Sequence, residues 1–392
     1  MIDITRIQQA LRREHLDAWL LYDFRGQNLI AREVLETPAQ AILTRRWFYC
    51  IPASGEPVAL QQVMEPDSVA HLPGRRIVYR DRGSLEQGLR EMVGRCARVA
   101  MEYSPRAALP TLSRVDCGTV ELVESLGPQV VSSANLVQDF LAVLTEAQVA
   151  GHRRACAVVM KVKDAAFARA AELVGRGQNL GEYDLQQFIL EQFQCHGIET
   201  DHAPIVAVNA HAGMPHYEPS LSTNTPIRKG DLLLVDLWGR EPGGVFADIT
   251  WTGFLGPAVP APVAKVFRIV AEARDAAVAA IGSAHQAGRV ITGAEADRAS
   301  RAVIQKAGFG DKFIHRTGHS ITATLHGPGA NLDDFETEDS RPLVPGLLFS
   351  VEPGIYLDEF GIRSEINVLM TANGPEVTTL PLQTEVLPLL QK

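Results

Sequence analysis

The N-terminal third of the chain alternates short apolar runs with stretches of helical spacing. The runs are short and bounded by turn residues, which predicts β-strands; they cover residues 17–22, 41–51, 57–63, 76–79 and 98–103. Residues 84–93 and 132–143 repeat apolar positions at helical spacing. Strands that alternate with helices predict a small α/β domain.

A long alanine-rich stretch from Thr145 to about Val174 follows. It has few helix breakers and its apolar positions recur at helical spacing, which predicts one long helix. A chain of 392 residues also exceeds the size at which one core stops growing. We therefore predict two domains, at residues 1–143 and 144–392.

The second domain is predicted to contain two helix pairs separated by strands. One helix follows Asn179, which has capping-box spacing to Glu182, and ends near Gly197. Residues 261–284 and 292–308 form the other pair. Strands are expected at residues 204–208, 232–237, 246–252, 347–351 and 364–370. This order suggests two related α/β halves around a shared site.

Composition and charge exclude several classes of protein. Hydrophobic residues are 46% and charged residues 21%, as in globular proteins. The net charge of −9, without a long run of either sign, argues against a nucleic-acid partner. No signal peptide or membrane span is visible. Five cysteines without a C-x-x-C pair suit free thiols, so we expect a cytoplasmic protein without a membrane partner.

Two aspartates stand in apolar strand patterns. Asp236 ends the run Leu232 to Val235, and Asp248 follows a Pro-Gly-Gly turn. A hairpin would bring both carboxylates to one face. Any single aspartate here is more simply a turn residue. Two buried together, however, require a cation because like charges cannot both stay ionised in a low-dielectric site.

Three further residues extend this set. His319 lies in His-Arg-Thr-Gly-His, and Glu352 and Glu365 lie in apolar runs expected to be strands. Four carboxylates and one imidazole suit Mn, Fe, Co or Zn rather than a thiolate site. Such a set can hold two ions with a bridging hydroxide, which predicts a metal-dependent hydrolase.

Several motifs occur together in a specific order. They are Pro215-His216-Tyr217, the strand with Asp236, Asp248-Ile249-Thr250, His315 to His319, His326, Glu352-Pro353-Gly354-Ile355-Tyr356, and Arg363 before Glu365. With these motifs the chain resembles the creatinase and methionine aminopeptidase superfamily of "pita-bread" metallopeptidases, and within it the prolidases and Xaa-Pro aminopeptidases. The resemblance implies a small N-terminal creatinase-like α/β domain and a C-terminal catalytic α+β pita-bread domain.

The resemblance also implies a role for each matching residue. Asp236 would chelate one of two divalent ions, most simply Mn, Co or Zn. Asp248 and Glu365 would bridge both ions, and His319 and Glu352 would complete the other site. Glu352 would also shuttle the proton of the bridging hydroxide.

Other matching residues surround this set. His216 and His326 would contact the scissile carbonyl and support the tetrahedral intermediate; either could instead be an ordinary core or surface histidine. His315 and Arg363 would orient the ligands, and Arg363 could equally be a strand-edge charge. Tyr356 fits a wall of the pocket or the core.

The chain departs from the family pattern at several places. Trp251 stands where an arginine often follows Asp-x-Thr, and His326 precedes Gly327-Pro328 instead of a glutamate. The spacing of the two aspartates is one residue longer than usual, and the residues after His319 lack the frequent Gly-x-Gly. None of these removes a ligand. They concern the shape of the pocket and hence the choice of substrate.

The first interpretation is an Xaa-Pro dipeptidase (prolidase) whose N-terminal domain restricts substrate length. The alternative is an Xaa-Pro aminopeptidase acting on longer proline-containing peptides. The N-terminal domain disfavours a methionine aminopeptidase. The complete ligand set disfavours both a metal-free creatinase-like enzyme and a non-catalytic binding protein. Relatives are commonly homodimers, and we expect a homodimer on that basis.

Overall fold

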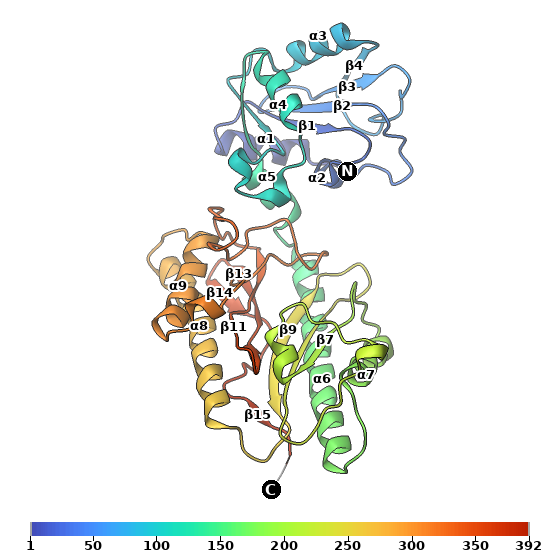
Figure 1. The fold of residues 1–392 in the computed structure, drawn as a ribbon. Helices are drawn as coiled ribbons and strands as arrows, with labels where there is room; N and C mark the ends of the chain where they lie inside the picture. Colours follow the sequence, from blue (N-terminus) through green and yellow to red (C-terminus); the bar gives the residue numbers. More distant parts are fainter. Residues whose placement is uncertain (1, 391–392) are drawn as a thin grey trace. The chain divides into compact units, whose positions relative to one another are not determined.

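The computed structural model describes residues 2–390, and the chain divides into two compact units, Met1–Leu141 and Ala142–Lys392. In Figure 1 the first unit runs from blue to teal and the second from green to red. Each unit has its own hydrophobic clusters. The two units are therefore described separately.

The first unit contains one six-stranded sheet flanked by helices. Its strands are β1 (Ala18–Asp23), β2 (Trp47–Pro52), β3 (Val58–Gln62), β4 (Arg75–Tyr79), β5 (Arg98–Met101) and β6 (Gln129–Ser132). Its helices are α1 (Ile4–Arg13), α2 (Leu29–Val34), α3 (Arg82–Val93), α4 (Cys117–Glu124) and α5 (Ala134–Leu141). The strand order is β4-β3-β2-β1-β5-β6, mixed parallel and antiparallel.

Both faces of this sheet are covered, which explains why β1 is apolar at every position but its last. Trp19 and Leu21 pack with residues of α1, α2 and α5. Ala18, Leu20 and Tyr22 point to the other face and pack with α3 and α4. Successive strand residues alternate between faces, so a continuous apolar run is what a doubly covered strand requires.

The largest error among the predicted strands of this unit concerns residues 41–51. The run 41–51 becomes a strand only from Trp47, because the amides of Thr44 and Arg45 donate to the Glu65 carboxylate, each at 3.1 Å, instead of to a neighbouring strand. The short strand β6 was not predicted.

The second unit contains three sheets and two helix pairs. Its helices are α6 (Glu146–Gly175), α7 (Glu182–Cys195), α8 (Ala261–Gln286) and α9 (Gly293–Lys306). Its strands are β7 (Ile205–Val208), β8 (Leu232–Gly239), β9 (Ala247–Phe254), β10 (Leu348–Val351), β11 (Gly354–Tyr356), β12 (Gly361–Arg363), β13 (Ile366–Thr371), β14 (Gly374–Val377) and β15 (Leu387–Pro388). The sheets have the orders β15-β9-β8-β7, β10-β13-β14 and β11-β12.

Each helix pair covers one side of the strands. Leu233, Val235 and Leu237 of β8 pack with α6 and α7, as do the alternate residues of β9. Phe349 of β10 and Val368 of β13 pack with α8 and α9. Figure 1 shows the green and the orange helices on opposite sides of the strands. The remaining strand faces point inward, and there the polar residues lie.

Two details of the predicted elements are wrong. The N-cap of α7 is Gly181, whose amide donates to Asp184 at 2.8 Å, and not Asn179. The cap prediction is wrong because Glu182 is fully buried and accepts hydrogen bonds from Val208 N and the Tyr217 hydroxyl. Asp236 does not end its strand, since β8 continues to Gly239.

A search of the helices within residues 2–390 for a membrane-spanning segment finds none of sufficient length and hydrophobicity.

Candidate metal centre

Asp236 and Asp248 lie on the inward face of the β8–β9 hairpin. The strands are antiparallel, with Asp236 opposite Thr250 and Trp238 opposite Asp248. These four residues share one face because side chains alternate along a strand. The apolar residues between them point to α6 and α7. The hairpin therefore brings the two carboxylates together, as the sequence pattern suggested.

The other half of the unit supplies His319, Glu352 and Glu365. His319 lies in a segment that runs along β10: Ser350 N donates to His319 O at 2.9 Å. Glu352 follows β10 and Glu365 precedes β13, so the two glutamates flank their strands instead of lying within them. The Glu365 amide donates to Thr250 O at 3.2 Å, which joins it to the first half.

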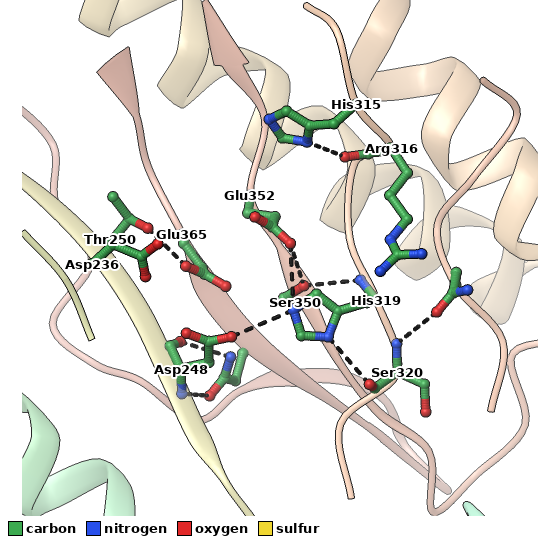
Figure 2. A network of polar contacts seen from close by, with 12 residues as sticks. Asp236, Asp248, Thr250, His315, Arg316, His319, Ser320, Ser350, Glu352 and Glu365 are labelled. Atoms are coloured by element: carbon green, nitrogen blue, oxygen red, sulfur yellow. Dashed lines mark hydrogen bonds and ion pairs between the residues drawn. The ribbon is translucent and has the colours of Figure 1, made fainter. Parts of the chain in front are cut away.

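These side chains converge on one space. His319 Nε2 lies 3.4 Å from Asp248 Oδ2 and 3.5 Å from Glu352 Oε1. One ligand atom each from Asp248, His319 and Glu365 lies within 4.8 Å of the others. Figure 2 shows the carboxylates and the imidazole turned toward this common space.

The ligand atoms are held by further bonds from polar residues on the inward strand faces. Thr250 Oγ1 donates to Glu365 Oε2 at 2.8 Å, and Ser350 Oγ donates to Glu352 Oε1 at 3.1 Å. Asn367, fully buried, accepts from Asp248 N at 2.9 Å and donates to Asp248 O at 2.8 Å. The sequence analysis missed these roles. A polar residue two positions from a ligand in a strand was the available signal.

Arg363 is the cation within this cluster. Its guanidinium forms an ion pair with Asp236 and lies 3.9 Å from Glu352 Oε2. It also donates to Thr250 Oγ1 at 3.0 Å and to the Tyr356 hydroxyl at 3.1 Å. Arg363 thus contacts a predicted ligand, and one guanidinium faces four carboxylates.

The electrostatics of the site follow first from burial and then from this excess of negative charge. Burial raises the pKa of Asp236 to about 7 and that of Asp248 to about 8. It raises the pKa of Glu365 well above the usual range, and the neighbouring carboxylates add to the effect. Burial would also raise the pKa of Glu352, but the charges of His319, His315, Arg363 and Arg316 together lower it. Glu352 is therefore the carboxylate that most readily stays ionised.

The residues fit divalent metal ions. His319 Nδ1 faces the Ser320 carbonyl at 3.2 Å, so Nδ1 carries the hydrogen and Nε2 offers a lone pair to the cluster. Asp248 Oδ1 is buried and finds no hydrogen-bond partner in the described part of the chain. Lone pairs that face each other across a buried space need a cation between them.

A cavity of about 620 Å³ opens onto these groups, which is the size of pockets that take small ligands. It is lined by all nine residues predicted for the site: His216, Asp236, Asp248, His315, His319, His326, Glu352, Arg363 and Glu365. The His326 ring meets the His319 ring edge-on, with centroids 4.4 Å apart. Burial, the His319 charge and the Arg316 charge lower the pKa of His326 to about 4. His216 is exposed at the rim.

His315 and Tyr356 form a bonded pair beside Arg363. His315 Nδ1 lies 2.7 Å from the Arg316 carbonyl, which only accepts, so its Nε2 accepts from the Tyr356 hydroxyl at 2.7 Å. Burial lowers the pKa of His315 to about 4, which keeps the ring neutral. Tyr356 is buried and contacts Arg363. Neither side chain donates directly to a predicted ligand.

Buried acids that the sequence analysis missed hold the loops of the site. Asp297 of α9 accepts from Thr317 N at 2.9 Å and from Thr317 Oγ1 at 2.6 Å. Glu182 of α7 accepts from Val208 N at 2.7 Å and from the Tyr217 hydroxyl at 2.6 Å. Asp297 thus fixes the segment of His315 to His319, and Glu182 fixes the segment that carries His216.

Comparison with known proteins places this site in a family. The model of metallopeptidase family M24 matches residues 150–372. The probable dipeptidase PepE of Mycobacterium tuberculosis is 29% identical over 287 residues, 73% of this chain and 71% of that protein. The Xaa-Pro dipeptidase of Pyrococcus furiosus is 27% identical over 247 residues, 62% of this chain and 65% of that protein.

The fold is shared along the whole chain. The crystal structure of dipeptidase PepE from Mycobacterium ulcerans superposes with a TM-score of 0.71 at 23% identity, covering 99% of this chain and 97% of that one. At this identity the likeness concerns the fold. The predicted combination of an N-terminal α/β domain with a C-terminal pita-bread domain is confirmed.

Proposed function

The chain belongs to metallopeptidase family M24, and from this premise we propose that it is an Xaa-Pro dipeptidase dependent on two divalent metal ions. The substrate would be a dipeptide with proline at its C-terminus, and the bond broken would be the one before proline. Mn, Co and Zn suit the donor set.

One observation carries this proposal. Asp248, His319 and Glu365, from both halves of the unit, present ligand atoms within 4.8 Å of one another. Asp236 and Glu352 line the same cavity. Asp236, Asp248, His319, Glu352 and Glu365 would hold the ions.

The bound ions would supply a hydroxide at neutral pH and polarise the scissile carbonyl. The side chains would accept and donate the protons of the reaction. Glu352, with its lowered pKa, would accept the proton of the attacking water and pass it to the proline nitrogen as the C–N bond breaks. The products are a free amino acid and proline, and Glu352 returns to its ionised form.

Neutral histidine rings would stabilise the oxyanion. His326 beside His319 is neutral at pH 7, so it would donate one hydrogen bond to the developing oxyanion, with His216 on the rim in support. Arg363 would orient Asp236 through their ion pair. His315 would act through Tyr356, whose hydroxyl contacts Arg363.

An Xaa-Pro aminopeptidase is the second candidate. It would use the same residues and the same chemistry. The cavity of about 620 Å³ is compatible with it, since that volume also accommodates a peptide longer than two residues.

The test is hydrolysis of Ala-Pro, Ala-Pro-Ala and Ala-Ala by metal-free protein, with and without added Mn, Co or Zn. We expect metal-dependent cleavage of Ala-Pro and little cleavage of the other two. Preferred cleavage of Ala-Pro-Ala would move the assignment to the aminopeptidase. Ala-Ala cleaved as well as Ala-Pro would indicate a general dipeptidase, and no cleavage with any metal would refute the proposal.

A further inference from the structure

Arg316 is a cation of the cavity that the catalytic scheme does not use. It lies between His315 and the ligand His319 in the chain, is partly buried, and lines the same cavity. His319 and His326 line this cavity too. Figure 2 shows the guanidinium of Arg316 on the side of the cluster where His319 lies.

Among residues 2–390, no carboxylate oxygen lies within 4.0 Å of the Arg316 guanidinium. Its charge acts on Glu352 only at longer range, where it helps to lower the pKa of that carboxyl. The other arginines of this unit that are buried or partly buried each pair with an acid: Arg240, Arg274, Arg301, Arg341 and Arg363. A shielded guanidinium loses part of its hydration, so it normally has an anion beside it. Within residues 2–390, Arg316 forms no such ion pair.

The backbone that carries Arg316 is fixed from both sides. Arg301 donates to the His315 carbonyl at 2.8 Å, and Asp297 accepts from the amide and the hydroxyl of Thr317. Arg301 and Asp297 are themselves an ion pair on α9. A side chain held at its backbone loses less entropy when it binds a ligand. The backbone of Arg316 is thus held in place before any ligand binds.

We propose that Arg316 binds the C-terminal carboxylate of the substrate and thereby selects dipeptides; this rests on the proposed function. A dipeptide places its carboxylate within about one residue length, 3.5 Å, of the scissile nitrogen. A cation can reach it only from beside the ligand cluster, and Arg316 lines the same cavity as the ligands. The planar guanidinium matches a carboxylate through two parallel hydrogen bonds.

The experiment compares Ala-Pro with Ala-Pro amide, which presents the same bond without the negative charge. The full-length protein loaded with Mn²⁺ is assayed as wild type, Arg316→Met, Arg316→Lys and Arg240→Met. Arg240 is the matched control, because it is also partly buried but pairs with Glu199 and lies outside the cavity lining.

We expect Arg316→Met to raise KM for Ala-Pro about 10- to 100-fold, as loss of a charge-assisted bond predicts. The values for Ala-Pro amide should change about twofold or less, since the amide makes no such bond. Arg316→Lys should retain part of the preference for the free acid, because lysine keeps the positive charge but cannot donate two parallel hydrogen bonds. Arg240→Met should leave the ratio of acid to amide unchanged.

A binding measurement separates this inference from the proposed function. Calorimetry with proline and prolinamide gives the same comparison without catalysis. If the protein hydrolyses Ala-Pro but Arg316→Met does not change its preference for Ala-Pro over Ala-Pro amide, the inference about Arg316 is wrong and the proposed function stands. If the protein hydrolyses neither compound but binds proline in a way that depends on Arg316, the proposed function is wrong and the inference about Arg316 stands. Neither hydrolysis nor Arg316-dependent binding would overturn both.

Discussion

At the scale of single residues, Asp248 is the most informative test of the metal centre. Its Oδ1 atom is buried without a partner, and Oδ2 faces His319. Asp248→Asn keeps the shape of the side chain but removes the charge. We expect metal analysis to show one bound ion or fewer in place of two. The loss in kcat/KM should exceed the 10- to 100-fold typical of residues outside the coordination sphere.

The control is Glu218→Gln, which changes an exposed acid lining the same cavity. It should keep both ions. If Asp248→Asn also bound two ions and turned over normally, the ligand assignment would be wrong.

The raised pKa values of Asp236, about 7, and Asp248, about 8, predict how metal stabilises the protein at different pH. Both groups have a folded pKa above the unfolded one, so without metal they are protonated below pH 7. The metal-free protein then loses stability as pH rises through these values. Metal binds only the ionised carboxylates. The increase in Tm on adding Mn²⁺ should therefore grow between pH 6 and pH 8.5.

Thermal unfolding with Mn²⁺ and with EDTA, at half-unit steps of pH, measures this difference. An increase in Tm that stays constant or shrinks with rising pH would show that these carboxylates are not the groups that metal deprotonates.

At the scale of elements, Asn367 joins β13 to β9. Its amide group exchanges two hydrogen bonds with the backbone of Asp248. Asn367→Ala would leave a buried N–H and a buried C=O unpaired, so we expect the free energy of unfolding to fall by about 2 to 4 kcal/mol. Metal affinity should weaken as well, because Asp248 loses its support. Urea unfolding and metal titration measure the two effects.

Asn373→Ala is the matched control, since Asn373 is exposed in the turn after the same strand. Its effect should be within about 0.5 kcal/mol. Equal effects of the two substitutions would show that the contact between Asn367 and Asp248 is not a stabilising link.

The same elements show what the sequence could predict. The long helix α6 and the apolar strands β8 and β9 were predictable because periodicity is local. The carboxylate ligand candidates stood out as charges within or next to apolar runs. Asn367 and Glu182 did not, because their roles depend on contacts between distant segments; Asn367 and Asp248 are 119 residues apart. Glu182 was read as a cap, whereas its burial against Val208 and Tyr217 appears only in the folded chain.

At the scale of the whole molecule, the division into two units predicts that residues 142–392 fold without the remainder. The clusters that cover β8, β9, β10 and β13 lie entirely within this unit. Every proposed metal ligand lies in it as well, so no ligand would be lost on truncation. We expect the fragment to unfold cooperatively and to bind two ions.

Circular dichroism and metal titration of the fragment test this, with the full-length chain as the reference. The fragment also tests the expectation from the sequence analysis that the N-terminal domain restricts substrate length. If it does, cleavage of Ala-Pro-Ala by the fragment should increase relative to cleavage of Ala-Pro. If the fragment folds and its preference for Ala-Pro over Ala-Pro-Ala is unchanged, the selection of substrate length lies within residues 142–392. Arg316 is the residue that we propose for it. A fragment that failed to fold would mean that the core of residues 142–392 depends on the first unit, and the domain division would be wrong as an account of stability.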